Sequence, residues 1–150
     1  MSPNLTQQMH HALRLAGEAA RVGEIPVGAV LFDASGTVLA QARNQSEALK
    51  DPTAHAEMLA LKTALATGRR YFEDCTLAVT LEPCAMCMGA LCAARVGTVI
   101  FGAYDAKSGG TVHGARVPDH SHFKPKILGG IEEEVCTALL KSFFETLRTD

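Results

Sequence analysis

The sequence lacks several features that would assign it to a class at once. None of its apolar runs approaches the roughly 18 residues that a membrane-spanning helix needs. Its first residues show no basic flank followed by an apolar stretch, so no export signal is expected. Lysine and arginine number 14 against 16 aspartate and glutamate residues, so no overall basic field attracts a polyanion. We therefore expect a soluble, cytoplasmic protein that makes no membrane contact.

Internal repeats, low-complexity tracts and linkers are also missing. The chain has 150 residues, of which 47% are hydrophobic, and this is enough to bury the core of one ordinary domain. We expect a single domain over residues 1–150. Five cysteines, an odd number, favour reduced thiols and metal ligation over a disulfide framework. Three of them, Cys75, Cys92 and Cys136, have apolar neighbours and are predicted to be core side chains.

The spacing of apolar residues predicts the elements near both ends of the chain. Apolar side chains recur every three or four residues over residues 4–21, which predicts an amphipathic helix. Residues 27–32 and 37–42 predict two antiparallel strands, joined by a polar turn that ends in Gly36. A closing helix is expected over about residues 132–147, with one apolar face made of Val135, Leu139, Leu140, Phe143 and Leu147.

The middle of the chain alternates between strands and helices. Strands are predicted over residues 75–80 and 96–102, and helices over residues 54–66 and 82–94. Thr53 is the expected N-cap of the first of these helices, and Pro83 is expected in the first turn of the second. Residues 103–125 form a long polar connection, where we expect substrate contacts. This alternation favours an α/β domain with a mixed central sheet.

Two short motifs carry side chains that suit a metal ion: His55-Ala56-Glu57 and Pro83-Cys84-Ala85-Met86-Cys87. The imidazole of His55 and the thiolates of Cys84 and Cys87 suit zinc and leave the fourth tetrahedral position free for water. Glu57 stands two residues from His55, so a carboxylate that can move protons would lie near that water. The pair of motifs predicts a hydrolytic enzyme with one Zn²⁺ per chain.

The motifs leave some alternatives open. An offset of two residues in an ideal helix rotates a side chain by about 200°, so Glu57 faces the metal only if the first turn lies across the floor of the site. A C-x-x-C pair alone also fits a redox pair or half of a structural zinc site. The chain would then be a binding module in which Cys92, or a loop histidine from the group His113, His120 and His122, completes the zinc coordination.

The sequence resembles the zinc-dependent nucleoside and nucleobase deaminases, and in particular the bacterial tRNA-specific adenosine deaminases. The H-A-E and P-C-x-x-C motifs occur in cytosine, cytidine and guanine deaminases as well. Asp51 to Glu57, D-P-T-A-H-A-E, and Phe101 to Gly109, F-G-A-Y-D-A-K-S-G, point toward the tRNA enzymes. The resemblance covers nearly the whole chain, from Gly23 to Phe144.

This resemblance implies a fold, a reaction and a set of substrate contacts. The implied fold is a cytidine-deaminase-like three-layer α/β/α arrangement with a mixed sheet of about five strands. The implied reaction is hydrolytic deamination of adenosine to inosine at the wobble position of a tRNA anticodon, with Glu57 moving the protons. The implied substrate contacts are Asn44 to the base, an apolar wall from Pro26 and Val27, backbone groups of Ala56 and Cys84, and Asp105 and Lys107 to the neighbouring nucleotides.

The resemblance also implies partners. These are the anticodon stem-loop of a tRNA and a second copy of the chain in a homodimer, with no organic cofactor. Because the overall charge is slightly negative, RNA affinity would have to come from a local basic patch, for which Arg69, Arg70, Lys107, Arg116, Lys124 and Lys126 are candidates.

The sequence departs from this family after Asp105. Many relatives carry a longer insert with an S-L pair and an N-H-R. Here the run from Ser108 to Arg116 is shorter, and His122-Phe123-Lys124 stands in place of N-H-R. This difference keeps open an alternative function, the deamination of a free nucleobase or nucleoside such as guanine, cytosine or adenosine.

Overall fold

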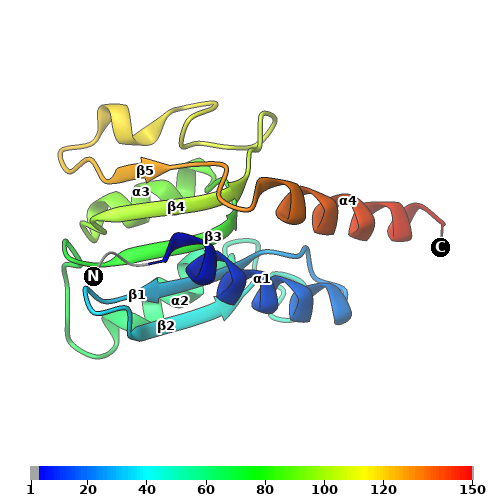
Figure 1. Ribbon diagram of the computed structural model, residues 1–150, viewed down its shortest axis with the longest axis horizontal. Helices are drawn as coiled ribbons and strands as arrows, with labels where there is room; N and C mark the ends of the chain where they lie inside the picture. The colour runs from blue at the N-terminus through cyan, green and yellow to red at the C-terminus, as the bar shows by residue number, and fades with distance from the viewer. Residues whose placement is uncertain (1–3, 150) are drawn as a thin grey trace.

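The computed structural model describes residues 4–149 as a sheet of five strands with helices on both faces (Figure 1). In chain order the elements are α1 (Leu5–Arg21), β1 (Gly28–Phe32), β2 (Val38–Arg43), α2 (Ala56–Leu65), β3 (Thr76–Leu81), α3 (Ala85–Ala93), β4 (Thr98–Ala103), the 3₁₀ helix η1 (Val117–His120), β5 (Lys126–Leu128) and α4 (Glu133–Thr149).

The sheet is mixed, as the sequence predicts. Its strand order is β2-β1-β3-β4-β5; β1 runs antiparallel to β2 and β3, whereas β3, β4 and β5 are parallel. Four strands match the ranges expected from apolar patterning. The fifth, β5, has only three residues and none is fully buried, so its apolar pattern does not separate it from the long connection before it.

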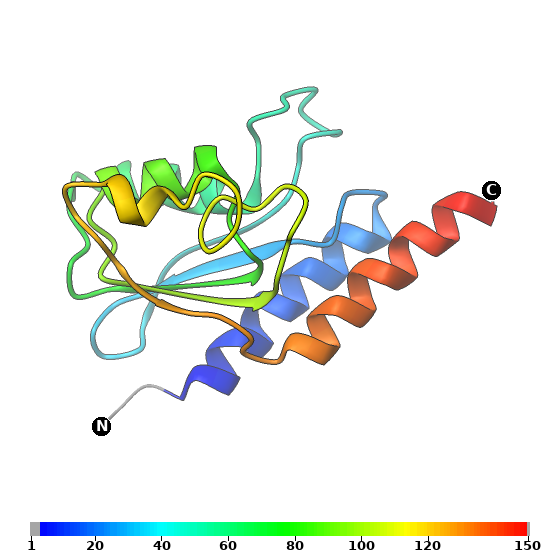
Figure 2. The ribbon, with the colours of Figure 1, turned by 90° about the horizontal axis from the view of Figure 1, so that it is seen from above.

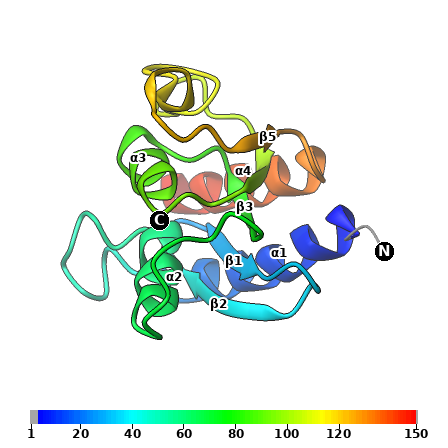
Figure 3. The same ribbon diagram turned by 90° about the vertical axis from the view of Figure 1, so that its left-hand side faces the viewer.

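The helices make three layers, α/β/α. Helices α1 and α4 run beside one another under one face of the sheet, and α2 and α3 lie side by side over the other (Figures 2 and 3). Each face has its own buried apolar cluster. The three-layer arrangement expected from the family resemblance is therefore confirmed.

Helix α1 begins where Asn4 caps it and packs closely against β1. The Asn4 side chain accepts a hydrogen bond from the backbone N–H of Gln7 at 3.1 Å. A Cβ atom on Gly28 of β1 would lie 2.1 Å from the carbonyl oxygen of Ala12, so only glycine allows this approach. The first helix is thereby fixed against the centre of the sheet.

The turn between β1 and β2 forms as its sequence predicts. Asp33 Oδ1 accepts hydrogen bonds from the backbone N–H groups of Ser35 and Thr37, both at 2.9 Å. Gly36 has a φ of +90°, a value that glycine adopts without strain.

Both central helices start later than the sequence suggests. Thr53 is not the N-cap of α2, because its N–H and hydroxyl both donate to Asp51 Oδ1, at 2.9 and 2.7 Å. His55 takes the N-cap position instead, with extended φ and ψ of −73° and 153°. In the same way Cys84 is the N-cap of α3, so Pro83 lies before the helix and not in its first turn. These shifts place two metal-binding side chains at helix caps.

Helix α4 departs from expectation in which residues it buries. Val135 and Leu147, expected on the packed face, are 51% and 54% exposed. Cys136 and Leu140 make the contacts with the core. The outer part of α4 extends past the end of the sheet (Figure 1), which is consistent with the exposure of Leu147. None of the helices in the described part of the chain is long and apolar enough to cross a membrane.

Candidate metal centre and active site

A cavity of about 550 Å³ opens where β3 and β4 end and where α2 and α3 begin. In an open α/β sheet the carboxyl ends of the strands are the usual place for a ligand. The residues that line this cavity are Ile25, Val27, Asn44, His55, Ala56, Glu57, Leu81, Glu82, Cys84, Tyr104, Asp105, Lys107, Ser108, Leu140 and Phe144.

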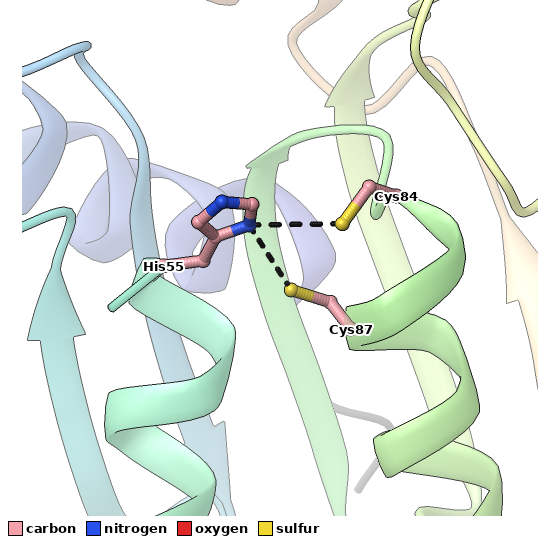
Figure 4. Close-up of side chains that lie close together, drawn as sticks. All are labelled: His55, Cys84 and Cys87. Atoms are coloured by element: carbon pink, nitrogen blue, oxygen red, sulfur yellow. Dashed lines mark hydrogen bonds between the residues drawn. The ribbon is translucent and has the colours of Figure 1, made fainter. Parts of the chain in front are cut away.

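His55 and Cys84, which line this cavity, converge with the buried Cys87 behind them. His55 Nδ1 lies 3.6 Å from Cys84 Sγ and 3.4 Å from Cys87 Sγ (Figure 4). The three donor atoms all lie within 4.8 Å of one another. The ring points its Nδ1 atom, and not Nε2, at the two sulfurs, so the free ring nitrogen faces away from them.

These separations fit a zinc ion. Zinc lies about 2.0–2.1 Å from a histidine nitrogen and about 2.3 Å from a cysteine sulfur. At a tetrahedral angle those bonds separate nitrogen from sulfur by about 3.5 Å, close to the 3.4 and 3.6 Å found here. Among residues 4–149 the cluster has three members, the set that leaves one zinc position open for chemistry.

The cluster already favours a thiolate. Hydrogen bonds from Cys87 and from His55 lower the pKa of the Cys84 thiol to about 4. The hydrogen bond with Cys84 raises the pKa of His55. The hydrogen bond between the two thiols raises the pKa of Cys87. Because Cys84 is an N-cap, the exposed N–H groups of α3 also favour a negative charge on it. A cation placed among these donors would therefore meet negative charge.

Glu57 lies in the same cavity as the metal-binding side chains. Its residue is 5% exposed, and burial raises the pKa of its carboxyl to about 7. The 200° rotation expected between helix positions two apart does not apply, because His55 is an extended cap residue and only Glu57 is helical. Both side chains can therefore face one space.

The predicted base-contacting residues surround the inner part of the cavity, with one exception. Asn44, Val27 and Ala56 line it. Asn44 is 5% exposed, and its Oδ1 accepts from the Ser46 backbone N–H at 3.3 Å, which fixes the amide. Pro26 is buried but does not line the cavity, and Ile25 and Val27 form the apolar wall expected of it.

The outer part of the cavity combines predicted and unexpected residues. Asp105 and Lys107 lie on its rim, as expected. Tyr104, Leu140 and Phe144 complete this rim and were not expected to be site residues. Tyr104 and Phe144 are 44% and 41% exposed, which leaves aromatic surface at the opening. The apolar spacing of the closing helix predicts only that Leu140 packs against the core. It does not predict that α4 reaches the cavity.

The long connection does not supply a fourth metal ligand. His113 Nδ1 lies 2.8 Å from Glu82 Oε1, and His120 and His122 are exposed. Cys92 is buried in the apolar cluster between the sheet and α3. Cys75 and Cys136 are buried as well, as expected of core cysteines. His10 is exposed. His11 is half-buried, and its Nε2 atom lies 2.6 Å from Gln41 Oε1.

Comparison with known families identifies the class to which this fold and metal centre belong. The model of the cytidine and deoxycytidylate deaminase zinc-binding region matches residues 3–103, which include all three metal-binding side chains. The chain belongs to this deaminase family. The structure brings together three donors, His55, Cys84 and Cys87, in positions that can bind the zinc ion of this family.

Individual relatives narrow the class. A tRNA-specific adenosine deaminase of Aquifex aeolicus is 43% identical over 141 residues, which is 93% of each chain. A tRNA(Ile)-lysidine synthase of Deinococcus radiodurans is 43% identical over 143 residues, 93% of this chain but 24% of that protein. The chain therefore spans about a quarter of the length of the lysidine synthases that it matches.

A solved structure shares the fold over most of the chain. It comes from work on A-to-I editing by tRNA:A34 deaminases at the wobble position of transfer RNA. It is 36% identical, covers 90% of this chain and 99% of its own, and superposes with a TM-score of 0.85.

Proposed function

We propose that this protein converts adenosine to inosine at the wobble position of a tRNA anticodon. The observation that carries the proposal is the cluster of His55, Cys84 and Cys87 at a cavity that the buried Glu57 also lines. The likeness to the Aquifex aeolicus tRNA-specific adenosine deaminase, over nearly the full length of both chains, supports the choice of substrate.

The reaction adds water to C6 of adenine and releases ammonia. When bound by His55, Cys84 and Cys87, zinc supplies Lewis acidity that makes water nucleophilic near neutral pH. Glu57 takes a proton from the attacking water and delivers it to the ring nitrogen beside C6. It then carries the second proton to the departing amino group. Water and adenosine are thereby consumed, and inosine and ammonia are formed.

The inner wall of the cavity holds the base. Asn44 offers a fixed amide to the polar edge of the purine, since its own oxygen is already held by the Ser46 N–H. Val27 and Ile25 cover an apolar face of the ring, and the backbone of Ala56 lies beside the metal-binding His55. A base enters such a pocket only when it leaves its stack, which is least costly in a single-stranded loop.

The rim suits RNA better than a free nucleoside. Lys107 provides a positive charge for a phosphate, and the exposed rings of Tyr104 and Phe144 provide surfaces on which neighbouring bases stack. A free base would fill only the inner wall and leave this rim unused.

The basic residues that were candidates for an RNA-binding patch do not lie together, because they are found at opposite ends of the sheet. Arg69 and Arg70 precede the start of β3, so they lie at the end of that strand remote from the cavity. Arg69 is paired with Asp74, and Lys124 Nζ lies 3.3 Å from Asp119 Oδ1. Lys107 lies on the rim of the cavity, and we assign it the contact with RNA beside the target nucleotide.

The proposal includes three further features. All site residues lie in one sheet, its helices and the loops that join them, which supports a single deaminase domain over residues 1–150. We expect the protein to act in the cytoplasm, where tRNA is found, and to form a homodimer, as the family resemblance implies. Sedimentation at micromolar concentration tests the dimer, and a monomer would contradict it.

Deamination assays test the proposal directly. The zinc-loaded protein is incubated with an anticodon stem-loop RNA that has adenosine at the wobble position, and separately with free adenosine, guanine and cytosine. We expect inosine in the RNA, detected after nuclease digestion, and no ammonia from the free compounds. Ammonia from a free base together with unmodified RNA would instead establish the alternative function, nucleobase deamination.

A further inference from the structure

Glu82 is a second buried acid that lines the cavity, and the proposed chemistry gives it no part. It directly follows β3 and precedes Cys84 by two residues. Its side chain is 0% exposed. A carboxylate removed from water is destabilising unless hydrogen bonds replace its hydration. The contacts of Glu82 therefore indicate its role.

All of those contacts come from one segment, residues 105–113. Glu82 Oε1 accepts from the backbone N–H of Asp105 at 3.0 Å and lies 2.8 Å from His113 Nδ1. Glu82 Oε2 accepts from three successive backbone N–H groups, those of Thr111, Val112 and His113, at 3.3, 3.0 and 3.0 Å. One carboxylate thus joins both ends of the segment, and His113 contributes with both its backbone and its ring.

The segment wraps tightly around this carboxylate. A Cβ atom on Gly109 would lie 2.6 Å from Glu82 Oε2, and one on Gly110 would lie 2.3 Å from the Ala85 nitrogen. The backbone therefore approaches both Glu82 and the start of α3 more closely than a side chain would allow. Thr111 Oγ1 also donates to the carbonyl of Pro83 at 2.9 Å. Glu82 and the cap of α3 together form the surface on which the segment rests.

The same segment carries three residues of the rim. Asp105, Lys107 and Ser108 line the cavity; Asp105 is itself bound by Glu82, and the other two lie between the two points at which Glu82 holds the chain. Lys107 and Ser108 are exposed, so packing alone does not fix them. Asp105 Oδ1 accepts from the Ser108 N–H at 2.9 Å, which closes a turn inside the held segment. The position of this rim therefore depends on the hydrogen bonds to Glu82.

We propose that Glu82 is a positioning residue for RNA. With His113 as its side-chain partner, it holds residues 105–113 in the shape that presents Asp105 and Lys107 to the nucleotides beside the target. The inference rests on the proposed function, because only an RNA substrate has such nucleotides. It assigns to His113 a role within the fold of the segment and no direct contact with substrate.

Glutamine at position 82 tests this role with little change in volume. An amide has one acceptor oxygen where the carboxylate has two, and its NH₂ group cannot accept a hydrogen bond. Turned with its oxygen toward Thr111 and Val112, the amide leaves the Asp105 N–H without its acceptor. Turned the other way, it faces three N–H groups with a donor. The segment is thus expected to loosen in either orientation.

The experiment compares Glu82→Gln and His113→Ala with wild-type protein and with Glu73→Gln, a matched change at an exposed glutamate before β3. For Glu82→Gln we expect KM for the stem-loop RNA to rise roughly tenfold or more, since tenfold lies at the lower end of the effect of one lost hydrogen bond to a charged group. We expect kcat at saturating RNA and zinc content to stay at wild-type values. His113→Ala should raise KM by less, since four backbone donors remain, and Glu73→Gln should leave KM unchanged.

Hydrogen exchange without RNA gives a readout that is independent of the substrate. We expect the amides of residues 105–113 to lose protection in Glu82→Gln and in His113→Ala, while those of β3 and β4 keep theirs. Unchanged protection in both variants would overturn the inference, as would loss of zinc with an unchanged KM, because Glu82 would then act on the metal centre. If Glu82→Gln does not fold, His113→Ala alone decides. Wild-type protein that makes no inosine would refute the proposed function, whereas the exchange result would still decide how the segment is held.

Discussion

Replacing Glu57 by glutamine tests the proposed chemistry most directly. The change keeps the size and the buried position of the side chain, which is 5% exposed, but removes the group that accepts a proton. Proton transfer by a positioned side chain commonly contributes ~10²–10⁴ in rate, or about 3–5 kcal/mol of activation free energy. We therefore expect kcat for inosine formation to fall by at least ~10².

The structure shows why no neighbour can replace Glu57. The other acids among the described residues that line the cavity are Glu82 and Asp105. Both oxygens of Glu82 already accept hydrogen bonds from residues 105–113. Asp105 lies on the rim and its Oδ1 is held by the Ser108 N–H. The rate loss should therefore not be reduced by a substitute base.

The assay measures single-turnover deamination of the stem-loop RNA after each variant has been loaded with zinc. Zinc content should remain at one ion per chain, because His55, Cys84 and Cys87 are unchanged. The dissociation constant for RNA should also remain near the wild-type value. Glu73→Gln, at an exposed position, is the control. A zinc-loaded Glu57→Gln protein whose loss stays well below ~10² would remove Glu57 from its assigned role.

Three further predictions follow from the metal site, the rim and the core. Lys107→Ala should lower the salt slope of RNA binding by roughly 0.7, the value for one lost phosphate contact; an unchanged slope, or an equal change in Arg70→Ala at the remote end of the sheet, would exclude that contact. Cys87→Ala should purify with far less than one zinc ion per chain, and full zinc occupancy by metal analysis would contradict its assignment as a ligand. Gly28→Ala should lower the free energy of unfolding, measured by chemical denaturation, by about 1–3 kcal/mol because its Cβ meets the α1 backbone. Gly17→Ala, which has open space around it, should raise that free energy by up to ~1 kcal/mol. Equal effects of the two substitutions would refute the packing argument.

The sequence predicts the metal centre well because its ligands are marked by chemistry. His55 and Cys84 are 29 residues apart, yet an imidazole and two thiols in short motifs limit what they can bind together. The α/β class with a mixed sheet was also accessible, since alternating helices and strands admit few arrangements, whereas the three-layer order was expected only from the family resemblance. These features depend on residue type and period, which are visible in one chain.

Other features depend on long-range contacts that no local pattern records. Glu82 looks like part of the P-C-x-x-C motif, and nothing near it reveals that its partners lie 23 to 31 residues further on. The short strand β5 forms by pairing with β4, and its three residues carry too little apolar periodicity to predict it. Leu140 belongs to the predicted apolar face of the closing helix and Phe144 does not, and helical spacing marks neither of them as lining the cavity.

The two helix N-caps explain how residues marked by local motifs and residues placed by long-range contacts come to lie at one site. His55 and Cys84 each occupy an N-cap, where the backbone is extended. Glu57 follows His55 in the first turn of α2, and Cys87 follows Cys84 in the first turn of α3. An N-cap side chain points away from the regular helical direction, so His55 and Glu57 can face one cavity although they are two positions apart. Glu82 lies just before the second cap and holds the rim segment against it. The candidate metal ligands, the proposed proton-transfer group and the rim segment are thus positioned by the starts of two helices, and a substitution that shifts either start should affect all three together.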